Sequence, residues 1–218
     1  MLYETPPWFF GFDIAFELVF AAITLAVSLQ SWRVFKLTRQ RMPKLFGTGF
    51  LLISVSYLVW AFVNLTIALK LDDASCAFCL GLQVALLDRI GIFLHLLFFL
   101  AGVVVLTYNT LRIKSAPTLT LLLILTLGWL VLTIQKLWVF YILTSILFIF
   151  IVSYYLQRFL DRRSWKTFSI FLAFVLLFLG TLQFIFLSVN TVYYAAGHVL
   201  ELVAYILILV ELIRVLKK

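Results

Sequence analysis

The stretch VYYAAGHVLELVAYILILVELI, from Val192 to Ile213, decides the class of fold. It is apolar and long enough to cross a bilayer as a helix, which takes about 20 residues. His198 and Glu201 lie three residues apart within it and therefore share one face of that helix. Ionisable groups inside a membrane are costly and usually face the protein interior or a wet cavity. The stretch therefore predicts a membrane-spanning helix that carries a buried polar site.

The composition of the whole chain agrees with a membrane protein. Of its 218 residues, 65% are hydrophobic and only 12% are charged, whereas in a typical globular domain about half are apolar and a quarter charged. We predict an all-α fold of seven transmembrane helices in a single domain, residues 1–218. Besides 192–213, the predicted spans are 12–32, 46–69, 90–111, 118–135, 137–157 and 167–187.

The distribution of basic residues predicts the topology. All but Lys70, Arg89 and Lys136 fall between the first and second, third and fourth, or fifth and sixth predicted helices, or at the C-terminus. Because cytoplasmic loops carry the excess of lysine and arginine, we expect an outside N-terminus and a cytoplasmic C-terminus in the cell membrane. The net charge of +8 is then a topology signal rather than a sign of nucleic-acid binding.

A weak internal repeat is a further hypothesis. Aligning His95 with His198 also aligns Lys114 with Lys217, and each aligned helix ends in a basic inner segment. The repeat units would be 12–111 and 137–213, joined by the helix at 118–135. Because the first and fifth helices run in the same direction, this predicts a parallel 3+1+3 layout.

Two outer segments lie beside these spans. Residues 1–11 are rich in proline and aromatic side chains, which is typical of the membrane interface. The stretch 80–87 is apolar but too short to span, so we expect a separate interfacial or re-entrant helix. Cys76 and Cys79 precede it on the outer side, where disulfides persist. They predict either a structural disulfide or free thiols, or a redox-active pair working with a partner.

Polar residues concentrate in the outer half of the predicted bundle. Counting helical rise from the outer helix ends puts Glu17, His95, His198 and Glu201 at depths of about 8–16 Å. The inner half has one comparable group, Glu211, which can pair with Arg214 three residues on. The distribution predicts an outward-facing pocket, for which the candidate ligand-binding residues are Asp13, Glu17, Trp60, Asn64, His95, Gln183, His198 and Glu201.

Three kinds of chemistry fit this set of residues. Carboxylates and imidazoles beside Trp60 could bind a cation or a polar small molecule. Glu17, His95, His198 and Glu201 could hold zinc or a similar divalent metal, as in the seven-helix hydrolases of the ceramidase and adiponectin-receptor type, although those use three histidines. His95 and His198 could instead be axial ligands of a haem. The sequence leaves these alternatives open.

The pattern Gly197-His198-x-x-Glu201-x-x-x-Tyr205, in a final helix that enters a basic tail, resembles the last helix of seven-helix sensor modules of microbial signalling proteins. That resemblance implies a ligand-binding or sensory module that acts with a cytoplasmic or membrane signalling partner. The 3+1+3 layout is also similar to the SWEET sugar transporters, but their Pro-Gln pair is missing here. The alternatives are a metal- or haem-binding redox protein or hydrolase, and a small-solute transporter.

Overall fold

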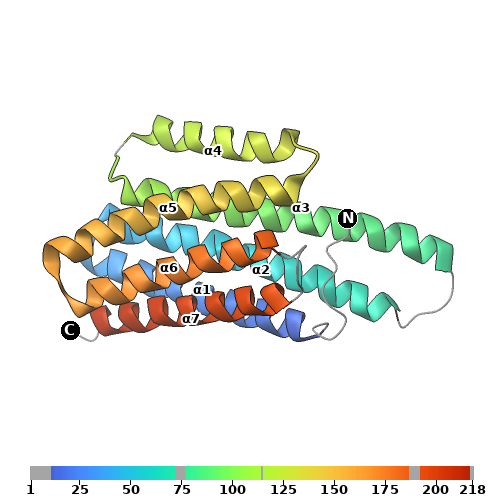
Figure 1. Cartoon of the computed structure of the whole chain (residues 1–218), viewed down its shortest axis with the longest axis horizontal. Coiled ribbons are helices and arrows are strands. Elements are labelled where there is room, and N and C mark those ends of the chain that lie inside the picture. The colour runs from blue at the N-terminus through green and yellow to red at the C-terminus, as the bar shows by residue number, and fades with distance from the viewer. Residues whose placement is uncertain (1–10, 72–76, 114, 187–191, 217–218) are drawn as a thin grey trace.

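The computed structural model describes residues 11–71, 77–113, 115–186 and 192–216 (Figure 1). Every regular element in these ranges is a helix, so the predicted all-α fold of seven helices is confirmed. The helices are α1 (Phe12–Thr38), α2 (Arg41–Leu71), α3 (Ala77–Thr110), α4 (Ala116–Leu132), α5 (Lys136–Arg162), α6 (Trp165–Ile185) and α7 (Val192–Leu216).

Six of the seven helices are long and apolar enough to cross a membrane. The exception, α4, is also apolar but has only 17 residues. Because a membrane core of about 30 Å needs about 20 helical residues, α4 is at the short limit for a span. The chain is a multi-pass membrane protein by helix length and hydropathy.

Tight turns join the helices at the basic end of the molecule. Arg39 after α1 and Arg163 after α5 both have left-handed backbone conformations, with φ of 56° and 44°, which is a common way to end a helix. Ser164 then starts α6, and its side chain accepts a hydrogen bond from the Thr167 backbone N–H. These ends let α2 and α6 fold back directly along α1 and α5.

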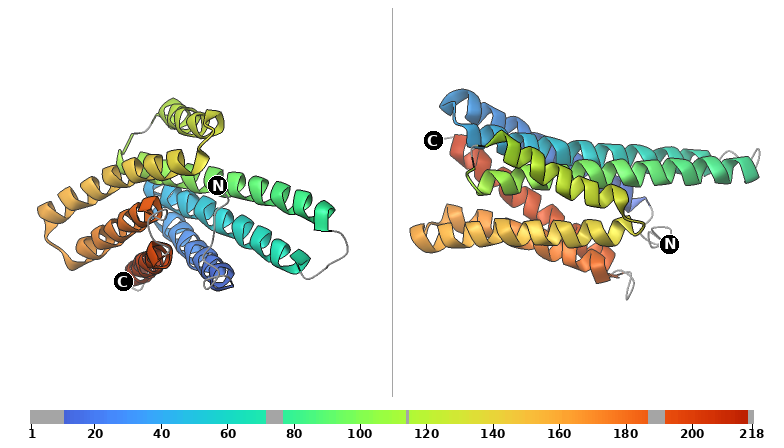
Figure 2. Two further views of the ribbon diagram at one scale, coloured as in Figure 1. Left: turned by 45° about the vertical axis from the view of Figure 1, so that its right-hand side comes forward. Right: turned by 90° about the horizontal axis from the view of Figure 1, so that it is seen from above.

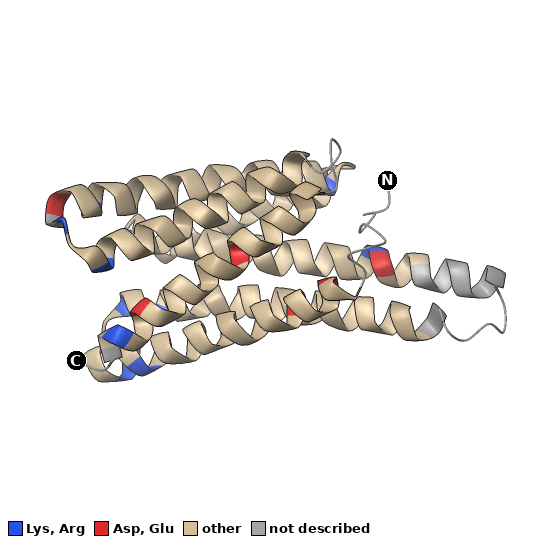
Figure 3. Ribbon diagram, turned by 60° about the horizontal axis from the view of Figure 1, so that its bottom comes forward, with Lys and Arg blue, Asp and Glu red and all other residues tan. Residues whose placement is uncertain are grey.

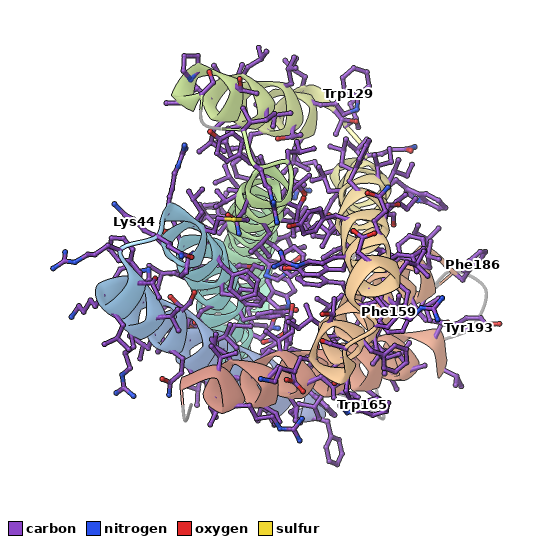
Figure 4. All side chains as sticks on the ribbon, turned by 90° about the vertical axis from the view of Figure 1, so that its left-hand side faces the viewer. Lys44, Trp129, Phe159, Trp165, Phe186 and Tyr193 are labelled. Atoms are coloured by element: carbon purple, nitrogen blue, oxygen red, sulfur yellow. The ribbon has the colours of Figure 1, made fainter. Side chains whose placement is uncertain are left out.

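The helices α1, α2, α3, α5, α6 and α7 form a closed ring in that order, because each packs against the next and α7 packs against α1. The helix α4 lies outside this ring, against α3 and α5 (Figure 2). Seen along the bundle, side chains fill the interior of the ring, and Trp129 of α4 points away from it (Figure 4). The sequence repeat, with α4 as its joining helix, stays a prediction.

The expected separate helix at 80–87 is wrong, because α3 runs unbroken from Ala77 to Thr110. No proline interrupts this segment, and an interior glycine weakens a helix without having to end it. At 1.5 Å per residue, α3 is about 50 Å long and exceeds a membrane core of about 30 Å. As a result α2 and α3 project together beyond the other helices at one end (Figure 2).

Two predictions fall on parts of the chain outside the described residues. The interfacial segment at 1–11 is outside them except for its last residue. Cys76 is outside them as well, and the side chain of Cys79 is not described. The predicted disulfide or redox role of this pair therefore stays a prediction.

Glycines bring α2 and α3 close together in the half of the bundle near the basic end. A Cβ atom on Gly102 would lie 2.7 Å from the backbone oxygen of Gly49, and one on Gly49 would lie 3.1 Å from that of Gly102. Small residues at a helix interface allow such backbone contact in membranes. Phe50, Val103 and Leu106 are buried around this contact, so this half of the ring is tightly packed.

Lysines and arginines lie at the ends of the bundle, whereas acidic residues also lie along its middle (Figure 3). Most lysines and arginines lie at the end where α7 finishes, opposite the start of α1. At this end Arg214 donates to Glu211 over 2.7 Å, which confirms the pairing predicted from their spacing. The charge asymmetry is a property of the fold, and the side of the membrane on which the basic end lies stays a prediction.

Candidate functional site

Glu201, in the middle of α7, connects this helix to α2. The Tyr57 hydroxyl donates to Oε2 of Glu201 over 3.1 Å, and the hydroxyls of Tyr57 and Tyr205 are also 3.1 Å apart. Because Tyr57 has a single hydroxyl proton, Tyr205 is the donor to Tyr57. All three residues are buried, so this short chain of hydrogen bonds crosses the ring interior from α7 to α2.

His198 lies one turn nearer the start of α7 and faces α1 rather than Glu201. Its Nε2 is 3.4 Å from Oδ1 of Asp13, which also accepts a hydrogen bond of 2.7 Å from the Tyr194 hydroxyl. The rings of Tyr194 and His198 are 4.5 Å apart and tilted. Spacing on one helix face predicted the His198 and Glu201 pair, and the structure gives each a partner on another helix.

Glu17 is the second carboxylate that α1 brings to the ring interior. Its Oε1 accepts a hydrogen bond of 2.8 Å from Nδ2 of Asn64 on α2. Its Oε2 is buried and has no hydrogen-bond partner among the described residues. Glu17 is only 2% exposed, and an unsatisfied buried carboxylate oxygen is costly. A hydrogen-bond donor that reached this oxygen would relieve that cost.

His95 lies on α3, where Ser56 of α2 holds its ring. The Ser56 hydroxyl is 2.8 Å from Nδ1 of His95 and 3.0 Å from the His95 backbone oxygen. The Trp60 ring lies 5.7 Å from the imidazole, centroid to centroid. This arrangement fixes the orientation of the imidazole and leaves Nδ1 occupied by protein groups.

These groups surround one cavity of about 50 Å³. We call it the outer cavity after the predicted topology, in which the end of the bundle away from the basic residues faces outward. Every helix of the ring contributes to its wall, and α4 does not. Since a cavity needs roughly 10–15 Å³ to hold one water, the outer cavity has room for a few waters or a very small ligand. Its lining residues are Glu17, Tyr57, Trp60, His95, Phe99, Phe140, Tyr141, Thr181, Phe184, Tyr194, His198 and Glu201.

The structure brings together most of the residues that the sequence singled out. Glu17, Trp60, His95, His198 and Glu201 line the outer cavity. Asp13 and Asn64 lie behind the wall and bond to its members. The exception is Gln183, which is not part of the lining.

Sequence reasoning missed three residues of this site. Tyr57 and Ser56 stand in an apolar run, where a hydroxyl gives no signal of burial or depth. Tyr194 could have been found, because it lies four residues before His198 and so shares its helix face.

The geometry does not support a metal centre or a haem. No group of three His, Cys, Asp or Glu side chains is arranged to hold a metal within the described part of the chain. A porphyrin does not fit in about 50 Å³. The residues present do not fit either group in this conformation.

The Thr181 hydroxyl of the lining is not arranged as a nucleophile for hydrolysis. The Thr181 hydroxyl, the only aliphatic hydroxyl in the lining, donates to the backbone oxygens of Phe178 and Leu177, at 2.7 and 3.3 Å. An attacking hydroxyl needs an adjacent base in hydrogen-bond reach, and this one is turned back onto its own helix. The arrangement is suited to binding a polar group between carboxylates and rings.

Comparison of the chain with protein-family models, with curated proteins and with solved structures finds no match. The resemblance of α7 to sensor modules therefore stays a prediction. What is established is a multi-pass helical membrane protein whose ring of six helices encloses a small cavity lined by carboxylates, imidazoles and aromatic rings.

Proposed function

We propose that this chain is a ligand-binding or sensory module of the cell membrane, with a pocket that faces outward and a signalling partner on the membrane or cytoplasmic side. The observation that carries the proposal is the outer cavity. Six helices direct polar side chains into one small volume, and Glu17 keeps an unpartnered carboxylate oxygen there among the described residues. Polar groups in a membrane are retained where they have a function.

The helix α7 provides a route from ligand to partner. It carries His198 and Glu201 in the cavity wall and continues without a break to Arg214 at the basic end. A ligand that changes the contacts of His198 or Glu201 would shift a rigid element whose other end can meet a partner. Coupling of this kind needs two arrangements of α7 that the ligand binds with different affinity.

Transport is the rival function, and the floor of the cavity argues against it. Below Glu201, the rings of Phe20, Tyr57 and Tyr205 lie 5.1–6.1 Å apart, and Phe50 follows at 6.4 Å from Tyr205. All four side chains are buried. A transporter opens its site to each face in turn, and this packed aromatic floor favours binding without passage.

Thermal unfolding of the purified full chain in detergent, with a panel of small cations, anions and neutral polar molecules, tests the proposal. A ligand that binds the folded state raises the unfolding midpoint with concentration. We expect at least one compound to do so, and the shift to be lost in Trp60→Leu, in the cavity wall, but kept in Trp129→Leu, on the outer face of α4. No shift with any compound, or equal loss in both variants, would contradict binding in the outer cavity.

A separate measurement addresses the rival function. Uptake of the bound compound into sealed vesicles that contain the protein should not exceed uptake into empty vesicles. Uptake that Glu17→Gln or Glu201→Gln abolishes would establish transport instead.

A further inference from the structure

Resting on the proposed binding function, we infer that the ligand class of the outer cavity is a small organic cation, namely a primary alkylammonium group. The inference goes beyond the existence of a pocket, because it assigns the charge, the size and the chemical type of the occupant. Charge, wall chemistry and volume each support it.

The charge of the wall is the first argument. Glu17 and Glu201 both line the cavity, and Asp13 lies directly behind it against His198. No lysine or arginine is among the lining residues that the structure describes. Oε2 of Glu17 is buried and has no hydrogen-bond partner among them, so Glu17 has unused capacity to accept a hydrogen bond. An ammonium group brings both the charge and the N–H donors.

The aromatic wall is the second argument. Trp60, Phe99, Phe140, Tyr141 and Phe184 line the same cavity as the carboxylates. Aromatic faces attract organic cations, and tryptophan does so most strongly. Calcium and magnesium prefer six or more oxygen ligands, which a wall made mostly of rings does not supply. The combination of carboxylates with rings therefore favours an organic ammonium over a bare metal ion.

The volume is the third argument. A cavity of about 50 Å³ accepts an ammonium group with a short alkyl chain and excludes sugars, nucleotides and other large polar molecules. The Tyr57 and Tyr205 hydroxyls are already engaged with Glu201 and with each other. The expected arrangement has the ammonium nitrogen near Glu17 and the alkyl part against the rings.

Isothermal titration calorimetry of the full chain in detergent with methylammonium chloride, at constant ionic strength, tests this assignment. We expect saturable binding that Glu17→Gln weakens at least tenfold. Glu211→Gln is the matched control, because Glu211 is also a buried glutamate but lies at the basic end beside Arg214. This variant should bind methylammonium with the same affinity as the unchanged protein. Trp60→Leu is a second variant, so that the test holds even if Glu17→Gln does not fold.

Sodium chloride, sodium acetate and methanol are the comparison ligands. Methylammonium should bind at least tenfold more tightly than each of them. Acetate or methanol binding more tightly, with loss in Trp60→Leu, would overturn the cation assignment and leave the proposed binding function standing. Sodium binding as tightly as methylammonium would also overturn the assignment. Absence of binding by every compound would overturn the cation assignment, and the thermal-unfolding panel decides the proposed binding function separately.

Discussion

The two halves of the helix ring are built on different principles. The half away from the basic end is called outer here and the half beside the basic end inner, after the predicted topology. In the outer half, six helices stand around a cavity, and carboxylates, imidazoles and tyrosine hydroxyls face one another across it. In the inner half, the backbones of α2 and α3 meet at Gly49 and Gly102, and buried apolar side chains such as Phe50 and Leu106 fill the space. We infer that close packing of the inner half stabilises the protein and supports a polar, less well packed outer half. Functional sites are often less stable than the rest of the protein.

The largest effect should come from disturbing the inner half. In Gly102→Val, the added side chain meets the Gly49 backbone oxygen, which even a bare Cβ would approach to 2.7 Å. Backbone cannot move aside as a flexible side chain does, and overpacking of this kind costs at least about 1–3 kcal/mol. We expect little folded, monodisperse protein by size-exclusion chromatography and circular dichroism.

Gly128→Val is the matched control for this substitution. Gly128 lies on α4, and a Cβ there would meet nothing within 4 Å. This variant should purify like the unchanged protein. Equal behaviour of the two variants would show that the glycine contact between α2 and α3 does not support the inner half.

An intermediate effect should follow from a change at the boundary between the halves. Tyr57→Phe removes the donor to Glu201 and the acceptor for Tyr205. Leaving buried polar groups unsatisfied costs about 1–3 kcal/mol, so the free energy of unfolding in detergent should fall by that amount. Tyr193→Phe, at the partly exposed start of α7, is the control and should change stability by less than about 0.5 kcal/mol. A stability loss in Tyr193→Phe as large as in Tyr57→Phe would contradict a stabilising role for the Tyr57 hydrogen bonds.

The smallest effect, and one of opposite sign, should come from the cavity itself. Glu17→Gln removes a buried acidic group whose Oε2 has no hydrogen-bond partner among the described residues, and the side chain can still accept from Asn64. Because an unsatisfied buried carboxylate oxygen is costly, the unfolding free energy should stay unchanged or rise by up to about 1 kcal/mol. A clear loss of stability, measured by thermal unfolding without ligand, would mean that Glu17 is a structural contact rather than part of a binding site.

Apolar runs and basic connections predicted the helices well, for a physical reason. A membrane core demands long apolar segments whatever the function, so each of the seven predicted spans overlaps one helix of the structure. The prediction of a separate helix at 80–87 was wrong because it assumed that the helix at 90–111 begins where the membrane-spanning segment begins. Nothing in the sequence of α3 ends the helix there, and the segment from Ala77 to Thr110 continues beyond the membrane thickness.

The candidate site was predictable in its members but not in its pairings. Charged and imidazole groups in apolar runs must turn inward, which explains why Glu17, His95, His198 and Glu201 all line one cavity. Which of them bond depends on helix rotation and on the order of the ring, and spacing along one helix does not give either. Thus the partner of His198 is on α1 and the partner of Glu201 is on α2.

Access to the two halves from each side of the membrane tests the central claim most directly. Phe184→Cys places a thiol in the wall of the outer cavity, and loss of the phenyl ring enlarges that cavity. Phe148→Cys is the matched control, a buried phenylalanine of α5 that is not part of the lining. Both are made in a chain with Cys76→Ser and Cys79→Ser.

The measurement is labelling by a membrane-impermeant methanethiosulfonate reagent, in intact cells and in inside-out vesicles. The account predicts that Phe184→Cys reacts in intact cells and not in inside-out vesicles, and that Phe148→Cys reacts in neither. Reaction of Phe184→Cys from the inside, or equal reaction of the two variants, would contradict an outward-facing cavity above a closed inner half.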